Sequence, residues 1–106
     1  MSYQVQWTNI AEQDLSDIVD YIAQDSINNA LRVLDKLEKK ANDLNDFPQR
    51  GRVVPELLDT GISQYREIIS SPWRIIYRLG VDTVYIMGVF DSRRDLEGIL
   101  LNRLVR

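Results

Sequence analysis

Arginines in the second half of the chain are the residues best suited to bind an anion. Residues 49–106 hold nine basic residues, all arginine, and seven acids, whereas residues 1–48 hold nine acids and four bases. A guanidinium group offers a planar fork of donors that fits a carboxylate or a phosphate. The net charge of −3 argues against non-specific binding of nucleic acid, so the sequence predicts a local arginine site.

Side-chain alternation predicts two adjacent strands that place some of these arginines on one face. In Trp73–Leu79, large apolar residues alternate with Arg74 and Arg78, which is typical of a strand with one buried face. Val84–Phe90 repeats the pattern after a turn at Val81–Asp82. The expected cross-strand neighbours are Leu79 with Val84, Tyr77 with Ile86, Trp73 with Phe90, Arg78 with Tyr85, and Arg74 with Val89.

A third strand, Gln64–Ser70, is expected to add another arginine to this face. A three-residue turn from Ser70 to Pro72 puts Arg66 on the face of the other two arginines and Glu67 on the covered face. Because like charges on one sheet face repel, we expect a surface that recognises phosphates or the acidic side chains of a protein. The alternative is a solvated face whose arginines pair with Glu67, Asp91 and Asp95.

Catalytic and metal chemistry have few candidate residues. The chain has no histidine and no cysteine, which removes the commonest general base and metal ligand and every thiolate site. It also lacks a glycine-rich phosphate loop and the GxSxG and HExxH motifs. Asp14, Asp17 and Asp20 are interpreted as a solvated helix face, so no metal and no cofactor are expected. Metal-free RNA cleavage needs a base for the 2′-hydroxyl proton, for which the candidates are Glu67, Asp91 and Tyr85.

Two helices are expected before the strands. Alternation over residues 3–7 predicts a short strand, followed by a helix to about residue 24 that is capped by Thr8 or by Asn9 in a capping box with Glu12. A second helix, capped by Ser26, ends before Phe47–Pro48, because the residue before a proline disfavours helix.

The rest of the chain completes an α+β domain. Residues 49–61 are expected to be irregular, and a short last helix is capped by Asp91 or Ser92, with Arg103 and Arg106 near its end. We therefore predict one domain, 1–106, with an N-terminal strand, a helix hairpin, a three-stranded antiparallel meander and a C-terminal helix. The hairpin covers one face of the sheet and leaves the other partly open.

Apolar residues on and after the second helix suggest a partner groove as well as a core. A stripe with helical spacing is joined by apolar pairs in the irregular segment, and both core packing and partner binding account for this surface. The residues are Ala30, Leu34, Leu37, Ala41 and Leu44, then Val53, Val54, Leu57 and Leu58. No leader pattern and no apolar run of roughly 18 residues is present, so a cytoplasmic protein without membrane association is expected.

Five local motifs in this order resemble the ParE/RelE superfamily of type II toxin–antitoxin toxins, and the ParE (plasmid stabilisation) branch most. The likeness covers nearly the whole chain. It rests on an opening strand that leads into Ala11, Asp14, Leu15, Ile18, Tyr21 and Ile22, then on FPQRGR at 47–52, YRE at 65–67, WRIIYR at 73–78 and VFDSRRD at 89–95.

The resemblance implies a cytoplasmic bacterial toxin that is neutralised by a small antitoxin. The pair would repress its own operon, with operator DNA contacted only through the antitoxin. ParE-like toxins inhibit DNA gyrase, whereas RelE-like relatives cleave mRNA in the ribosomal A site. In the RelE branch, Arg74 matches a phosphate-binding arginine and Arg66 lies nearby.

Two departures from the RelE branch favour the gyrase inhibitor, which is not an enzyme. The chain lacks the lysines or glutamate usual before the second strand, and it has Asp91–Ser92 where histidine or tyrosine is expected. A ribosome-dependent endoribonuclease and a non-toxic binding module remain the alternatives. The expected target-binding residues are Arg66, Trp73, Arg74, Arg78, Tyr85, Arg93 and Arg94. The expected antitoxin-binding residues are Leu34, Leu37, Ala41, Val53 and Leu57.

Overall fold

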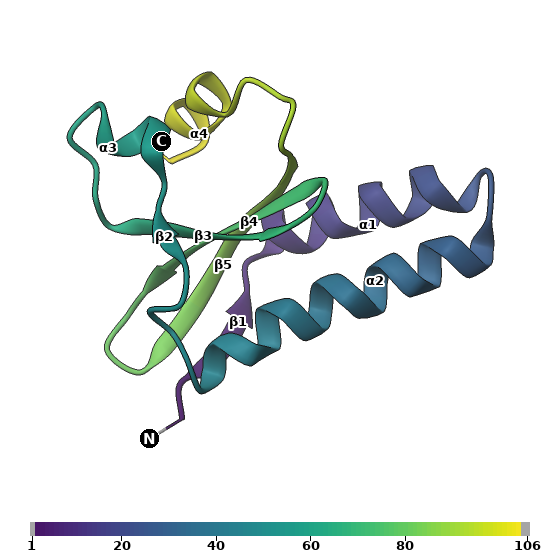
Figure 1. Ribbon diagram of the computed structural model, residues 1–106, viewed down its shortest axis with the longest axis horizontal. Helices are drawn as coiled ribbons and strands as arrows, with labels where there is room; N and C mark the ends of the chain where they lie inside the picture. The colour runs from purple at the N-terminus through teal and green to yellow at the C-terminus, as the bar shows by residue number, and fades with distance from the viewer. Residues whose placement is uncertain (1, 105–106) are drawn as a thin grey trace.

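The computed structural model describes residues 2–104 and places five strands in one mixed sheet (Figure 1). The strand order is β1-β5-β4-β3-β2, with β1 parallel to β5 and the other neighbours antiparallel. The α+β class and the order of elements agree with the sequence prediction, except for a short strand and helix between residues 49 and 61. The elements are β1 (Gln4–Trp7), α1 (Asn9–Ala23), α2 (Ile27–Asn42), η1 (Asp43–Asn45), β2 (Arg52–Val53), α3 (Pro55–Leu58), β3 (Tyr65–Ser70), β4 (Trp73–Leu79), β5 (Thr83–Asp91) and α4 (Leu96–Leu104).

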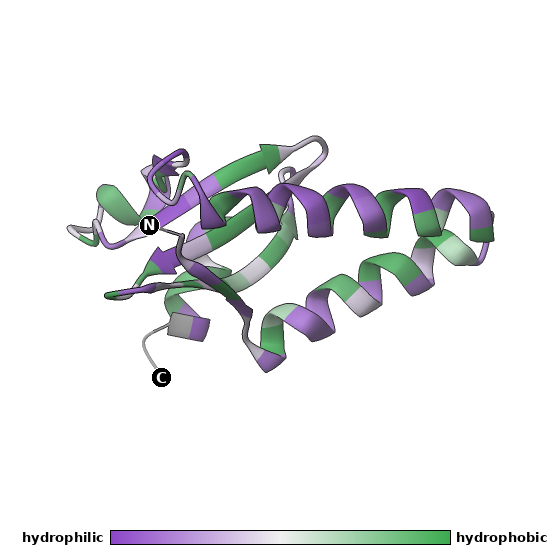
Figure 2. Ribbon diagram, turned by 90° about the horizontal axis from the view of Figure 1, so that it is seen from below, coloured by the Kyte–Doolittle hydropathy of each residue, from purple (hydrophilic) through white to green (hydrophobic). Residues whose placement is uncertain are grey.

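Side-chain caps fix the start of both long helices. The Thr8 hydroxyl accepts a hydrogen bond from the Ala11 amide at 3.3 Å, so Thr8 is the cap and the expected capping box at Asn9 is wrong. Ser26 caps α2 by accepting from the Asn29 amide at 3.1 Å, as predicted. The two helices form a hairpin whose apolar sides face inward and whose polar sides face outward (Figure 2).

The first core lies between this hairpin and one face of the sheet. Ala11 and Leu15 of α1 meet Leu37 and Ala41 of α2 over the strands, and all four are buried. The strand residues in this core are Ile68, Ile75, Tyr77, Val84, Ile86 and Val89.

A second core lies on the face that was expected to be partly open. α3 and α4 cover this face, on the side of the sheet away from the hairpin (Figure 1). The buried residues are Val54, Leu57, Ile76, Phe90, Leu96 and Leu100. The segments around α3 and α4 supply apolar side chains that cover part of this face, while Arg78 and Tyr85 on the same face stay half-buried.

A register shift between Ile76 and Tyr77 explains why Phe90 belongs to the second core. Before the shift, Leu79, Arg78 and Tyr77 pair with Val84, Tyr85 and Ile86, as predicted. Beyond the shift, Arg74 pairs with Phe90 and Trp73 with Asp91, so the expected Trp73–Phe90 and Arg74–Val89 pairs are wrong. One extra residue in a strand moves every later side chain to the opposite face.

The β3–β4 turn differs from the prediction by one residue. Ser70 pairs with Trp73, so the turn holds only Ser71 and Pro72. As a result, Arg66 pairs with Tyr77 and Glu67 with Ile76, the reverse of the expected facing.

The end of the chain also departs from the expected details. Asp95, rather than Asp91 or Ser92, accepts a hydrogen bond from the first turn of α4, through its Oδ1 and the Gly98 amide at 3.4 Å. Arg106 lies outside the described residues. None of the helices described over residues 2–104 combines the length and apolar character needed to cross a bilayer.

Candidate functional site

The structure separates the three arginines that were expected to share a sheet face. Arg66 lies on the side of Tyr77, where its Nη1 donates to the Gly51 carbonyl at 2.7 Å. Arg74 and Arg78 lie on the other side. The predicted three-arginine face is therefore wrong.

Arg74 is buried in an ion-pair network and is not an open anion site. Its Nε donates to Glu67 Oε1 at 2.6 Å, and its Nη1 and Nη2 donate to the two oxygens of Glu56 at 2.7 and 2.8 Å. Glu67 also accepts from Arg52 Nε at 2.6 Å. Arg74 is only 6% exposed, and the Glu67 carboxylate is fully buried. Two carboxylates thus occupy the donors that a phosphate would need.

Glu56 and Arg74 favour each other's charged forms. Hydrogen bonds from Arg74 lower the pKa of Glu56, and the hydrogen bonds to Glu56 and Glu67 raise the pKa of Arg74. The sequence analysis named Glu67 as a possible partner of the arginines, and the Arg74–Glu67 ion pair confirms this, but it did not select Glu56. The expected position of Glu67 on the covered face of the sheet could have pointed to this network, because a buried charge requires a partner.

Arg78 and Tyr85 form a separate pair on the same face as Arg74. The Arg78 guanidinium lies 4.5 Å from the centre of the Tyr85 ring, a distance typical of a cation–π contact. Both residues are half-buried. The predicted cross-strand pairing is confirmed here, and a target-binding role for this pair stays a prediction.

Trp73, Arg93 and Arg94 do come together, in a groove between the helix hairpin and the end of the sheet. The cavity has a volume of about 660 Å³ and is called the Trp73 groove here. Trp73 is half-buried, and both arginines are exposed. The lining residues are Asp14, Asp17, Ile18, Tyr21, Ile22, Asn29, Val33, Pro72, Trp73, Val89, Asp91, Arg93 and Arg94.

Asp91 and Arg93 form a paired charge at the mouth of the Trp73 groove. Arg93 donates from its amide and Nε to Asp91 Oδ1, both at 2.9 Å, and from Nη2 to Oδ2 at 2.6 Å. These bonds lower the pKa of Asp91 from its ordinary value of 3.8 to about 2. Arg94 forms no ion pair among the described residues and is the freer of the two arginines.

The contact between Asp91 and Arg93 leads to a prediction about the acid titration of Asp91. A lowered folded-state pKa means that Asp91 adds stability above about pH 3.8, and that this contribution is lost as the pH falls through about 2. We expect the carboxyl carbon of Asp91 to titrate in NMR spectra with a midpoint near 2, and Arg93→Gln to raise the midpoint toward 3.8. Arg94→Gln, the matched control, should shift it less, and an Arg93→Gln midpoint unchanged from wild type would contradict the assignment.

Three of the five expected antitoxin-binding residues belong to the interior. Leu37, Ala41 and Leu57 are 0% exposed, so they cannot contact a partner while the fold is intact. They were misassigned because helical spacing identifies an apolar stripe without showing what covers it. Leu34 and Val53 are half-buried and remain accessible.

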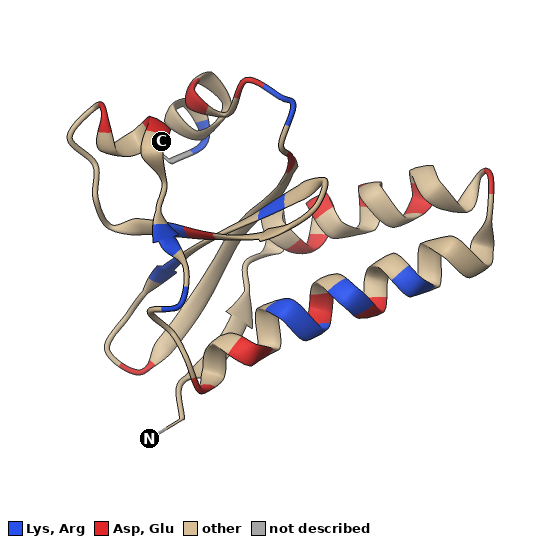
Figure 3. Cartoon of the chain, in the orientation of Figure 1, with Lys and Arg blue, Asp and Glu red and all other residues tan. Residues whose placement is uncertain are grey.

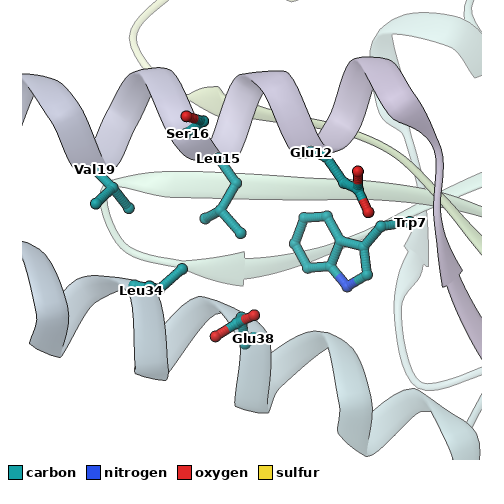
Figure 4. Close-up of a pocket in the computed structure, with 7 residues that line it drawn as sticks. All are labelled: Trp7, Glu12, Leu15, Ser16, Val19, Leu34 and Glu38. Atoms are coloured by element: carbon teal, nitrogen blue, oxygen red, sulfur yellow. The ribbon is translucent and has the colours of Figure 1, made fainter.

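Leu34 lines a second pocket, between α1 and α2 (Figure 4). This cavity has a volume of about 380 Å³ and is called the Trp7 pocket here. Trp7, Leu15, Val19 and Leu34 form its apolar walls, and Ser16, Glu12 and Glu38 complete the lining.

The loop between η1 and β2 is held to the sheet by Tyr77. The Tyr77 hydroxyl accepts from the Gly51 amide at 2.9 Å and donates to the Pro48 carbonyl at 2.8 Å, and burial raises its pKa. A side chain on Gly51 would meet the Glu67 carbonyl oxygen at 2.5 Å, so only glycine fits. The FPQRGR motif therefore positions backbone next to the sheet.

Asp14 links three elements that are distant in sequence. Its Oδ2 accepts from the Val89 amide at 3.1 Å and from Arg103 Nη1 at 2.7 Å. The Arg103 guanidinium also lies 4.7 Å from the centre of the Phe90 ring. These contacts fasten α4 to α1 and bind the Val89 amide in the part of β5 that extends beyond β1, a role that sequence patterns did not reveal. Across residues 2–104, no cluster of three or more acidic side chains could hold a metal ion.

Comparison with known proteins gives a consistent family result. The family model described as the ParE toxin of the type II toxin–antitoxin system parDE matches residues 5–96. Toxin RelE2 of Caulobacter vibrioides is 34% identical over 92 residues, which cover 86% of this chain and 97% of that protein.

Solved structures share the fold at low sequence identity. The chromosomal ParDE system from P. aeruginosa matches with a TM-score of 0.69 at 18% identity, over 85% of this chain and 96% of that one. The toxin–antitoxin complex RelBE2 from Mycobacterium tuberculosis matches with a TM-score of 0.64 at 23% identity, over 86% and 99%. A double mutant of the E. coli toxin RelE in the free state matches with a TM-score of 0.66 at 16% identity, over 100% and 98%.

Proposed function

We propose that this chain, which belongs to the ParE/RelE superfamily of type II toxin–antitoxin toxins, acts by binding DNA gyrase rather than by cutting mRNA. It is a type II toxin, and residues 1–106 would form one toxin domain in the cytoplasm. The proposal concerns the target, which the family alone leaves open between gyrase and the ribosome.

The burial and ion pairing of Arg74 are the main support for this proposal. This residue matches the phosphate-binding position of RelE-like toxins, yet here it is 6% exposed and bound by Glu56 and Glu67. A phosphate could bind there only by displacing Glu56 or Glu67, and displacing Glu67 would leave a buried acid without its Arg74 partner. This cost argues against a role for Arg74 in cleavage.

The candidate bases for RNA cleavage are each engaged by an arginine in the structure. Glu67 is buried between Arg52 and Arg74, and Asp91 is held ionised by Arg93. Tyr85 faces the Arg78 guanidinium. The chain has no histidine to replace them. Metal-free cleavage requires a base and stabilisation of the phosphorane charge, and the engagement of these candidate bases argues against it.

The Trp73 groove supports action by binding. It places a half-buried tryptophan beside exposed Arg94 and Tyr21, and aromatic residues and arginine are the residue types that dominate binding energy at protein interfaces. We therefore assign gyrase contact to Trp73 and Arg94, and we remove Arg74 from the contact residues.

A supercoiling assay with purified gyrase tests the proposal. Wild-type toxin is expected to inhibit supercoiling, and Trp73→Ala and Arg94→Glu are each expected to raise the inhibitory concentration about 30-fold. Arg32→Glu, an exposed arginine of α2 outside the groove, serves as the matched control and should inhibit like wild type. Circular dichroism of each variant separates loss of contact from loss of fold.

Other outcomes identify the two alternative functions. Cuts at ribosomal A-site codons in primer-extension mapping, with supercoiling unaffected, would establish an endoribonuclease. Normal growth after induction without the antitoxin would indicate a non-toxic binding module. Inhibition that persists in both groove variants would show that gyrase binds elsewhere on the toxin.

We also propose a cognate antitoxin as the partner that neutralises this chain. Two of the similar structures are described as a ParDE system and a RelBE2 toxin–antitoxin complex. Contact with operator DNA would take place through the antitoxin. Leu34 and Val53 are the expected antitoxin-binding residues that keep accessible surface.

A further inference from the structure

The Trp7 pocket combines apolar walls with two carboxylates that come from different helices of the hairpin. Figure 4 shows Glu12 of α1 next to the Trp7 indole and Glu38 on α2, between Leu34 and Trp7. Leu15 and Val19 line the side of α1, and Leu34 lines the side of α2. The pocket is therefore an apolar slot with one carboxylate on each of the two helices.

Both carboxylates are available to a partner. No ion pair and no side-chain hydrogen bond involves Glu12 or Glu38 within the part of the chain that the structure describes. By contrast, Asp14, Glu56, Glu67 and Asp91 all bind arginines. α1 carries four acids and no base, whereas α2 carries four bases and two acids, so the negative charge of the pocket comes from its α1 side and from Glu38 itself (Figure 3).

We propose that the Trp7 pocket receives an arginine side chain of the antitoxin. This inference rests on the proposed antitoxin partner and adds the chemistry by which it is recognised. The aliphatic stem of an arginine fits the walls formed by Leu15, Val19 and Leu34, as long cationic side chains bury their stems along apolar surface. The guanidinium then lies by the Trp7 indole and between two carboxylates, which match its cation–π and bidentate bonding.

The charge of the pocket excludes other kinds of occupant. A purely apolar side chain would remove water from Glu12 and Glu38 without giving them a partner, which is unfavourable. An acidic side chain or a phosphate would be repelled. Arginine is preferred over lysine because its planar head can donate to both carboxylates at once.

Titration calorimetry of the toxin with full-length cognate antitoxin tests the proposal. The double variant Glu12→Gln and Glu38→Gln is expected to bind about 30-fold more weakly than wild type, because truncating charged pairs at an interface has effects of this size. Asp20→Asn with Asp35→Asn makes the same change of charge on exposed positions of the same two helices and should bind like wild type. Unchanged affinity of the glutamate double variant would overturn the proposal.

A charge exchange identifies the partner residue. Each antitoxin arginine is replaced in turn by glutamate, and one replacement should weaken binding to wild-type toxin and restore it to Glu38→Arg toxin. N-acetylarginine amide, compared with its citrulline analogue, should shift the Trp7 indole NMR signal selectively. A shift with the amide combined with no arginine-specific rescue would indicate a site for small cations and would overturn the antitoxin assignment.

The outcome of the antitoxin-binding experiment can be distinguished from the outcome of the gyrase assay. Free toxin with Glu12→Gln and Glu38→Gln should inhibit gyrase like wild type and should only escape neutralisation. If wild-type toxin fails to inhibit gyrase, the proposed target is wrong while the calorimetric result still stands.

Discussion

Replacing Glu67 with glutamine is expected to lower the free energy of unfolding by about 3–5 kcal/mol, the usual effect of removing one partner from a buried ion pair. Glu67 is 1% exposed and accepts from both Arg52 and Arg74. The amide has nearly the same shape but no charge, so Arg74 would keep only Glu56 in a buried position. Urea denaturation followed by circular dichroism measures the loss.

Two further variants make this prediction specific. Glu97→Gln removes a charge from an exposed position and should change stability little. Glu67→Leu combined with Arg74→Met should be less destabilising than Glu67→Gln alone, because no buried charge is left unpaired. A loss below about 1 kcal/mol for Glu67→Gln would indicate that the network is open to water, which would reopen Arg74 as an anion site.

Replacing Leu37 with alanine is expected to destabilise the fold by about 2–5 kcal/mol. Leu37 is 0% exposed in the core between the helix hairpin and the sheet, so its removal leaves a cavity. Thermal or urea denaturation measures this loss in the free energy of unfolding. Antitoxin affinity, measured where the variant is still folded, should remain close to that of wild type, because Leu37 has no accessible surface.

Leu34→Ala is the matched comparison on the same helix. Leu34 is half-buried and lines the Trp7 pocket, so this variant should lose less stability but more antitoxin affinity. The opposite ranking, with Leu37→Ala impairing binding in a folded toxin, would mean that the antitoxin opens the hairpin to reach its core.

The motifs that identify the family serve the interior of this toxin as much as its surface. Gly51 permits close approach of the loop to the sheet, and Glu67 and Arg74 form the buried network. Asp14 fastens α4 and the edge of β5. A match to these motifs therefore supports the fold more strongly than it supports any target.

Local chemistry was sufficient to predict the long helices and strands of this protein, although it missed β2 and α3. Alternation in Trp73–Leu79 and 3.6-residue spacing in α2 depend on side chains a few positions apart, and so do the Ser26 cap and the turn at Val81 and Asp82. These signals need no knowledge of distant contacts, which is why the order of the elements and the α+β class could be read from the sequence.

The facing of side chains was decided only by tertiary structure. A two-residue turn after Ser70 and a register shift opposite Ile76 each change the strand register by one residue, and with a period of two this reverses which face a side chain occupies. Arg66 and Glu67 exchanged faces for this reason, and Phe90 joined the second core. The Trp7 pocket likewise needs two helices and a strand together, so no single stretch of sequence could show it.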